Sequence, residues 1–236
     1  MKKLFILGLA LLAACAANAI PTLTGPTGGF ELPTANVATG VTLDLNLVTG
    51  TNPAYPDAGV LCGICKGLEI GGQFEQNMPG MGTAATWNVN AKYQLPFTAG
   101  PVNLAVGASY GEAPYYYDET GTAFDHLWNV YLAGSTPLWG TTATANIGYA
   151  KDSTADWKGI SAGLAIEKSL NENTVAGAEF IFGDKVGTFT AVSPFNVHGN
   201  LYLTRILTKE LSARVGVGGI GYGTHLFVGA AYNFGK

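Results

Sequence analysis

Apolar and polar residues alternate along most of this chain. Between residues 41 and 47, every odd-numbered residue is Val or Leu and every even-numbered residue is Thr, Asp or Asn. A period of two residues is typical of a β-strand that has one face in apolar surroundings. The same pattern predicts ten further strands, at residues 68–74, 87–95, 102–110, 128–132, 143–149, 160–166, 176–182, 197–203, 211–217 and 226–234.

The second face of these strands carries few charges. Charged residues make up only 12% of the chain and apolar residues 47%, and the second face is mostly Gly, Ala, Ser, Thr and Asn. A soluble β-sandwich would place charged residues on its outer face. Past the first residues there is no apolar stretch of about 18 residues, so helical membrane spans are excluded. The composition therefore favours an all-β protein that crosses a membrane with strands.

Connection lengths give the number and direction of the strands. The links at 96–100, 135–140, 169–173 and 208–210 are short, and those at 112–123, 151–156 and 184–193 are longer. Outer-membrane barrels place short turns in the periplasm. The strand at 41–47 would then run inward, and we expect residues 28–33 to supply an outward strand before it. An even strand number gives a transmembrane antiparallel up-and-down β-barrel of about twelve strands, with ten as the alternative if 28–33 is a periplasmic arm.

The first residues have the features of a secretory signal. Lys2 and Lys3 precede an apolar stretch, and the small residues Ala17 and Ala19 provide a signal-peptidase site. We therefore expect a signal at residues 1–19 and one barrel domain at 20–236. Cys15 also fits the pattern for a lipoprotein that is acylated at cysteine. The net charge of −4 argues against nucleic acid as a partner.

Two short motifs resemble those of known envelope proteins. Gly229, Tyr232 and Phe234 resemble the C-terminal signal that outer-membrane proteins present to their insertion machinery. This resemblance implies that the lipid bilayer and that machinery are partners, and that the chain is located in the outer membrane. Residues 29–35, Gly-Phe-Glu-Leu-Pro-Thr-Ala, are similar to the opening of barrel proteins associated with exopolysaccharide secretion. This second resemblance implies a role in polysaccharide export or envelope assembly.

Cys62 and Cys65 fall in a link that we expect on the periplasmic side. Two cysteines in an oxidising compartment predict a disulfide, which requires a turn at residues 63–64 because positions i and i+3 of a strand face opposite sides. Thiol-disulfide exchange is the weaker alternative, since no helix follows Cys62 to stabilise a thiolate. No His or further Cys lies nearby to complete a metal site.

The sequence predicts no catalytic residue and no cofactor. A serine hydrolase needs a base beside its nucleophile, and His198 is the best candidate for that base. It belongs to an inward-facing set of Asn, Tyr and Thr residues, where a hydrogen-bonded lumen histidine is the simpler interpretation. We therefore expect no enzymatic activity.

The inward-facing charged residues are the candidates for function. They are Asp44, Glu69, Glu75, Glu167 and Glu179, with Lys92 and Arg214 as the cations. These residues either pair with one another inside a filled barrel or line a conducting lumen, in which an acidic excess favours cations. Small inward residues predict an open lumen, unless the first residues of the mature chain or a loop fold into it. We expect a passive channel for small polar solutes or ions, or else a non-conducting structural or accessory barrel.

Overall fold

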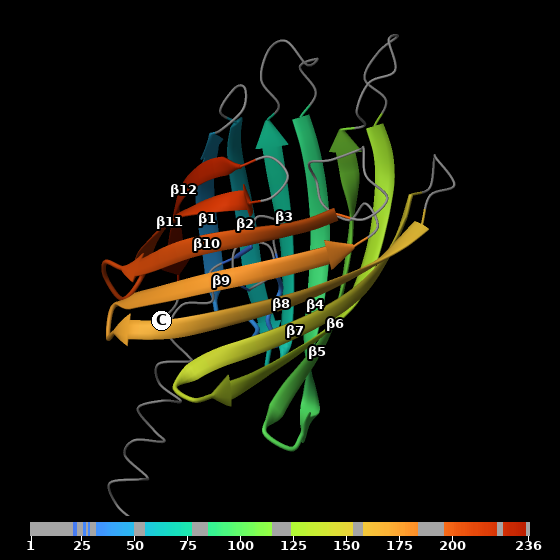
Figure 1. Cartoon of the computed structure of the whole chain (residues 1–236). Helices are drawn as coiled ribbons and strands as arrows, with labels where there is room; N and C mark the ends of the chain where they lie inside the picture. The colour runs from blue at the N-terminus through green and yellow to red at the C-terminus, as the bar shows by residue number, and fades with distance from the viewer. Residues whose placement is uncertain are drawn as a thin grey trace, which may run out of the picture.

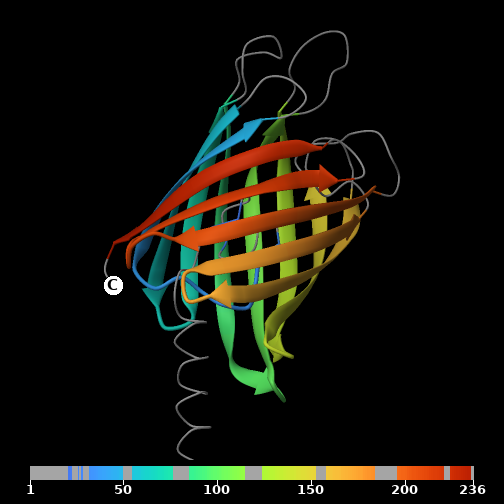
Figure 2. The same ribbon diagram turned by 60° about the vertical axis from the view of Figure 1, so that its left-hand side comes forward.

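The protein folds as a closed barrel of twelve antiparallel β-strands (Figures 1 and 2). The computed structural model describes residues 21–22, 26, 28, 32–49, 55–76, 85–114, 124–152, 158–183, 196–220 and 224–234. The strands are β1 (Val41–Thr49), β2 (Tyr55–Cys65), β3 (Leu68–Gln76), β4 (Ala85–Ala99), β5 (Val102–Pro114), β6 (Phe124–Leu138), β7 (Thr141–Asp152), β8 (Lys158–Asn171), β9 (Thr174–Gly183), β10 (Asn196–Ile206), β11 (Leu211–Ile220) and β12 (His225–Phe234).

Each strand pairs with its neighbours in the chain, and β1 pairs with β12 to close the barrel. The closing register runs from Val41 opposite Phe234 to Thr49 opposite Leu226. Because lipid offers no hydrogen bonds to a free sheet edge, a membrane sheet has to close in this way. The predicted fold class and the strand number of twelve are confirmed. Within the described part of the chain, no helix has the length and apolar character needed to cross a membrane.

The prediction of twelve strands was correct in number but wrong in one member. Residues 28–33 do not form a barrel strand, and the twelfth strand is β2. Gly28 and Pro33 make only an isolated bridge with each other. Strand β1 therefore starts at the end of the barrel where the short turns lie, and it does not run toward that end as we had expected.

The shortest connections lie at one end of the barrel and the longest at the other, as predicted. Two-residue links at 66–67, 100–101, 139–140 and 172–173 and the link at 207–210 share one end with the start of β1 and the end of β12. The connections at the other end span 50–54, 77–84, 115–123, 153–157, 184–195 and 221–224.

The outer face of the barrel is apolar. Each strand contributes at least one exposed aliphatic or aromatic side chain, for example Leu45, Val60, Ile70, Val89, Val106, Val130, Ile147, Leu164, Phe180, Leu201, Val215 and Val228. Exposed apolar side chains all round a closed sheet would be unstable in water and are the expected surface in lipid. The alternation that predicted the strands is therefore the alternation between a lipid-facing and an interior face.

Aromatic residues mark both ends of this apolar belt. Toward the long connections, the ring of Tyr110 lies 5.9 Å from that of Trp87 and 4.5 Å from that of Trp128. Near the short turns, Tyr232 and Phe234 pack edge to face at 4.7 Å. Aromatic girdles at the two lipid interfaces are typical of outer-membrane barrels.

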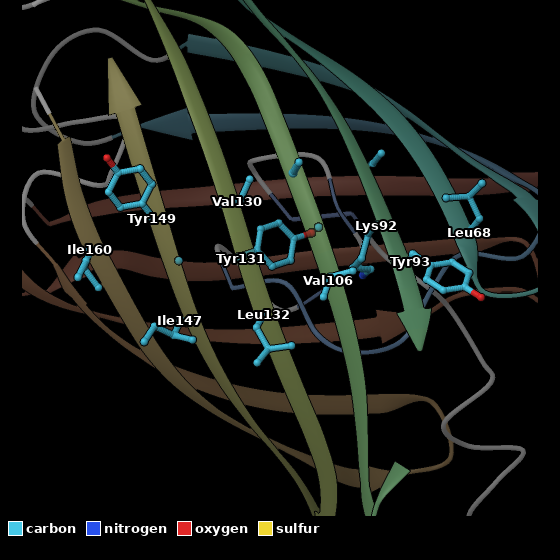
Figure 3. A pocket seen from close by; sticks show the side chains of 14 residues that line it. Leu68, Lys92, Tyr93, Val106, Val130, Tyr131, Leu132, Ile147, Tyr149 and Ile160 are labelled. Atoms are coloured by element: carbon cyan, nitrogen blue, oxygen red, sulfur yellow. The ribbon is translucent and has the colours of Figure 1, made fainter. Parts of the chain in front are cut away.

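The outer wall between β3 and β8 is hollowed (Figure 3). This hollow has a volume of about 680 Å³ and is lined mainly by outward-facing apolar side chains, with Tyr93 toward one side and Tyr149 and Ile160 toward the other. Small residues such as Ala91 contribute to its lining. The lining chemistry suits the hydrocarbon chains of the surrounding lipid.

Inside the barrel, large side chains lie flat over glycines of the neighbouring strand. A Cβ atom at Gly107 would lie 2.2 Å from the ring of Tyr131, and one at Gly177 would lie 2.1 Å from the ring of Tyr202. In both cases the glycine is the direct cross-strand partner of the tyrosine. Cross-strand aromatic cover of a glycine is a known device for fixing register. It also keeps bulky side chains close to the wall.

Candidate functional site

The interior of the barrel is lined by polar residues and is the candidate site. Its buried polar side chains come from nearly every strand: Thr42, Asp44, Asp57, Glu69, Gln73, Asn90, Lys92, Ser135, Thr144, Glu179, Asn200, Thr204, Arg214 and Asn233. A polar interior within an apolar exterior is the arrangement of an outer-membrane barrel with an aqueous or filled lumen.

The described residues that precede β1 lie inside this lumen, where Figure 2 shows them in blue. We call the described residues from 21 to 40 the N-terminal strap. Leu32, Ala35 and Ala38 of the strap are buried, and Leu32 packs with Ala165 and Ile181 of the wall. The sequence predicts an open lumen unless a segment folds into it, and the described strap residues do so.

The strap is held by side chains from strand after strand. Its backbone N–H groups donate to the wall: Ala38 to Glu69 Oε2 (2.6 Å), Ala35 to Ser135 Oγ (2.9 Å) and Leu32 to Glu179 Oε1 (3.4 Å). Its carbonyl groups accept from the wall at both ends: Gly40 from the Gly63 backbone N–H (2.8 Å), and Gly28 and Pro21 from the Arg214 guanidinium (3.3 Å each). Every one of these partners is an interior residue.

These contacts follow the order of the strands round the barrel. Asn233 of β12 donates to the Thr39 carbonyl next to the start of β1 (3.3 Å). Apart from this contact, the partners of the strap, read backward from Gly40, lie on β2, β3, β6, β9 and finally β11. A segment that crossed the axis would contact opposite walls, without passing the strands between them. The strap therefore runs along the inner wall.

Three of the seven predicted lumen charges, Glu69, Glu179 and Arg214, hold the strap. Glu69 pairs with Lys92 at 3.0 Å, and both side chains are fully buried. Figure 3 shows Lys92 beside Tyr131, whose ring covers Gly107. Since Glu69 also accepts the Ala38 N–H, it links the strap to a buried cation. An ion pair without water contact keeps its charges only while both partners are present.

The other predicted charges on the far wall are also engaged. Glu179 accepts from Asn200 Nδ2 at 3.1 Å in addition to the strap. Arg214 donates to Thr204 Oγ1 at 3.2 Å, and its guanidinium lies 5.3 Å from the centre of the Tyr202 ring. Glu167 accepts the hydroxyl of Tyr202 at 3.0 Å.

Asp44 lies on β1 and has a neighbouring carboxylate that the sequence did not reveal. Asn46 Nδ2 donates to Asp44 Oδ2 at 2.9 Å and to Asp57 Oδ1 at 3.2 Å. Asp57 was missed because residues 55–65 were interpreted as a link. A signal was present, since Ala58, Val60, Cys62 and Ile64 are alternate apolar residues in this segment. The backbone of Glu75 pairs with that of Asp57, and its side chain lies outside the described residues.

The predicted disulfide is not formed, and the structure shows why. Cys62 and Cys65 are free thiols on β2, not residues of a periplasmic link. Cys62 pairs in register with the outward-facing Val41 and Ile70, and Cys65 follows a register shift at the end of the strand. Two cysteines three positions apart on one strand do not bring their sulfur atoms together.

The remaining predicted residues are placed as follows. Tyr232 and Phe234 face outward, and Gly229 faces inward, where a Cβ would lie 2.0 Å from Asn46 Oδ1. His198 is half-buried on β10, opposite Ile181 of β9. Residues 1–20, including Cys15 and the signal, lie outside the described residues. Within the described part of the chain, no group of three or more His, Cys, Asp or Glu residues could hold a metal ion.

Comparison with known proteins shows the fold. No protein-family model matches the chain, and no curated protein matches it in sequence. Among solved structures, the KdgM porin is similar over 82% of this chain and 99% of its own, with a TM-score of 0.65 and 14% identity. The NanC porin is similar over 82% of this chain and 100% of its own (TM-score 0.61, 9% identity). An outer-membrane channel from Pseudomonas putida F1 is similar over 84% of this chain and 97% of its own (TM-score 0.59, 11% identity).

These likenesses and the closed twelve-stranded sheet define the class. The chain has the porin-like β-barrel fold of the bacterial outer membrane, with its apolar belt in the lipid bilayer.

Proposed function

We propose that this chain is a passive outer-membrane channel for small polar solutes or ions, narrowed by its N-terminal strap. The observation that carries this proposal is the course of the strap along the wall, past β2, β3, β6, β9 and β11 in order. A strap on the wall reduces the cross-section of the lumen, and the channel we propose is the space that this strap leaves along the axis. The cleavable signal at 1–19 and the C-terminal Gly229, Tyr232 and Phe234 would bring the chain to the membrane and its insertion machinery.

The charges of the lumen support a preference for cations. The described interior holds five carboxylates, Asp44, Asp57, Glu69, Glu167 and Glu179, against the two cations Lys92 and Arg214. An acidic lining raises the local concentration of cations and repels anions. One similar structure is the KdgM porin in complex with oligogalacturonate, which is an anionic sugar. The acidic excess here disfavours that class of solute and favours cations or uncharged solutes.

Conductance across a planar lipid bilayer tests the proposal. The purified protein is first shown to be folded by a heat-dependent gel shift. We expect discrete current steps and, in a KCl gradient, a reversal potential on the cation-selective side. Electrical silence from folded protein would overturn the proposal.

A variant that lacks residues 20–36 tests the role of the strap. We expect larger current steps than those of the full chain, because the wall contacts of Leu32 and Ala35 are gone while β1 remains. Leu32→Asn is the matched point variant, since it disturbs the packing of the Leu32 side chain on Gly163, Ala165 and Ile181 and leaves the rest of the strap in place. Equal step sizes in all three proteins would show that the strap does not narrow the pore.

A non-conducting accessory barrel in envelope assembly or exopolysaccharide export is the second candidate. The observation that favours it is the strap itself, whose buried residues occupy part of the lumen. Current from the variant lacking residues 20–36, together with silence from the full chain, would establish this second function. We propose no enzymatic role in either case, and His198 is then a lumen histidine.

A further inference from the structure

Two lysines lie side by side on the outer face of the barrel. Lys151 of β7 and Lys158 of β8 are exposed and lie directly opposite each other in the strand register. Directly opposed residues of an antiparallel pair have Cβ atoms about 4.5 to 5.5 Å apart, and like charges at that spacing are destabilising. Neither lysine makes an ion pair with another of the described residues. An anion that bridges both ammonium groups would remove their repulsion.

The lysine pair lies where the apolar belt ends. The next outward-facing residues toward the short turns are Tyr149 and Ile160, which are both exposed. Trp128 of β6 lies directly opposite Lys151 on its other side, and its ring packs against that of Tyr110. Such aromatic rings lie at the level of the lipid headgroups, and the long connections of outer-membrane barrels face outward. The pair therefore lies at the headgroup level of the outer leaflet.

The hollow in the outer wall adjoins this pair on the side of the hydrocarbon. Tyr149 and Ile160, the neighbours of the two lysines on the same face, line one side of the hollow (Figure 3). Residues two positions apart on a strand are about 7 Å apart, so a long lysine side chain reaches a headgroup whose chain enters the hollow. The lining also includes Ala91 and Ala108, which are small and exposed and leave room for a hydrocarbon chain.

The outward-facing cations near the short turns are placed differently. Lys168 of β8 lies opposite Ala176, and Arg205 of β10 lies opposite Thr174 and donates to its hydroxyl group. Neither of these cations lines the hollow. A pair of opposed cations beside an apolar hollow is therefore a feature of the lysine pair that these two residues do not share.

We propose that Lys151 and Lys158 bind the phosphate group of a lipid in the outer leaflet, with an acyl chain of that lipid in the adjoining hollow. A phosphate monoester carries a charge of about −1.5 to −2 at pH 7, which two ammonium groups balance. Lysine binds phosphate as a point charge on a flexible stem, which suits a site on a lipid-facing wall. The inference goes beyond the channel proposal and does not depend on whether the lumen conducts.

Quenching of Trp128 by brominated lipids tests the site, because bromine atoms on an acyl chain quench the tryptophans that they contact. Trp87→Phe/Trp139→Phe/Trp157→Phe leaves Trp128 as the single tryptophan. The folded protein is placed in phosphatidylcholine vesicles that contain a rising fraction of dibrominated phosphatidic acid or of dibrominated phosphatidylcholine. We expect phosphatidic acid to be favoured about twentyfold at this position, because each lysine near an anionic lipid contributes a factor of about five.

Neutralising the lysine pair should remove this preference. In Lys151→Gln/Lys158→Gln, made in the single-tryptophan protein, we expect a preference of less than about threefold. Lys168→Gln/Arg205→Gln is the matched control, because it removes the same charge from the outer face near the short turns. It should leave the preference unaltered. Heat-dependent gel shifts establish that each variant is folded.

Ala108→Phe tests the hollow without a change of charge. Its ring would fill part of the hollow, and we expect the preference for phosphatidic acid to fall several-fold, because the chain no longer holds the phosphate beside the lysines. Ala145→Phe, at an exposed position of β7 outside the lining, is the control. Equal quenching by the two lipids, or a preference that survives Lys151→Gln/Lys158→Gln, would overturn the inference. An unaltered preference in Ala108→Phe would overturn the assignment of the chain to the hollow.

Discussion

The contact between Tyr131 and Gly107 gives a sharp test of how the inner wall is built. In Gly107→Ala, the new Cβ would lie 2.2 Å from Tyr131 Cζ and 2.3 Å from its Oη. Ordinary carbon contacts are about 3.5 to 4.0 Å, so the ring has to move by more than an ångström. Tyr131 is buried, and a displaced ring loses its rotamer or its packing. We expect a loss of about 1 to 3 kcal/mol in the free energy of unfolding, the usual cost of overpacking.

Denaturant unfolding of the barrel in lipid vesicles, followed by Trp fluorescence, measures this loss. Gly72→Ala is the matched control, because its nearest neighbour would lie at an ordinary 3.5 Å. In a Tyr131→Ala background, Gly107→Ala should cost almost nothing, since the ring it strikes is gone. The reasoning is refuted if the cost of Gly107→Ala persists in that background or equals that of Gly72→Ala.

Three further changes probe the wall, the buried ion pair and the lipid face, all by the same titration. Gly177→Ala displaces Tyr202, whose hydroxyl donates a hydrogen bond to Glu167. The loss in the free energy of unfolding should be about 1 kcal/mol larger than that of Gly107→Ala, and a smaller loss contradicts this. Glu69→Gln leaves Lys92 buried without its carboxylate and should cost about 3 to 5 kcal/mol, most of it regained when Lys92→Met is added. Val130→Arg, at a position 52% exposed on β6, should cost about 2 to 4 kcal/mol, and no measurable cost would place Val130 outside the hydrocarbon.

The wall of the barrel could be predicted from the sequence because its physics is local. Apolar and polar residues have to alternate along a lipid-facing strand. The position of Leu43 or Val106 in this alternation therefore predicts which way its side chain points. The same alternation predicted that Asp44, Glu69 and Lys92 lie on the interior face, where the structure has them. Closure and an even number of strands follow from the need to satisfy every backbone group in lipid.

The assignment of the first strands failed for a reason that is also physical. Strand β2 carries Pro56, Gly59 and Gly63, and its inward Leu61 breaks the expected polar face, so its alternation is weak. Residues 28–33 were then assigned as the strand that makes the total number of strands even. Counting rules fix how many strands a barrel has, but they do not say which weak segment supplies the last one.

The strap shows what local patterns cannot give. Leu32, Ala35 and Ala38 are buried by partners that lie 147, 100 and 31 positions away in sequence. Nothing in the periodicity of residues 21–40 encodes those distances. Its position is fixed by unsatisfied backbone groups, which need donors or acceptors wherever the chain is buried, and the interior side chains supply them.

This use of the interior charges changes what they can do for a solute. A carboxylate that accepts a strap N–H and pairs with a buried Lys, as Glu69 does, has little attraction left for a passing ion. Glu179 and Arg214 are likewise engaged with the strap. Charge count alone would therefore overestimate the selectivity of the lumen. In the proposed channel, Asp44 and Asp57 would keep more attraction for a cation, because their side-chain hydrogen-bond partners Asn46 and Gln73 carry no charge. Neutralising these two carboxylates should change selectivity more than neutralising any strap-holding residue.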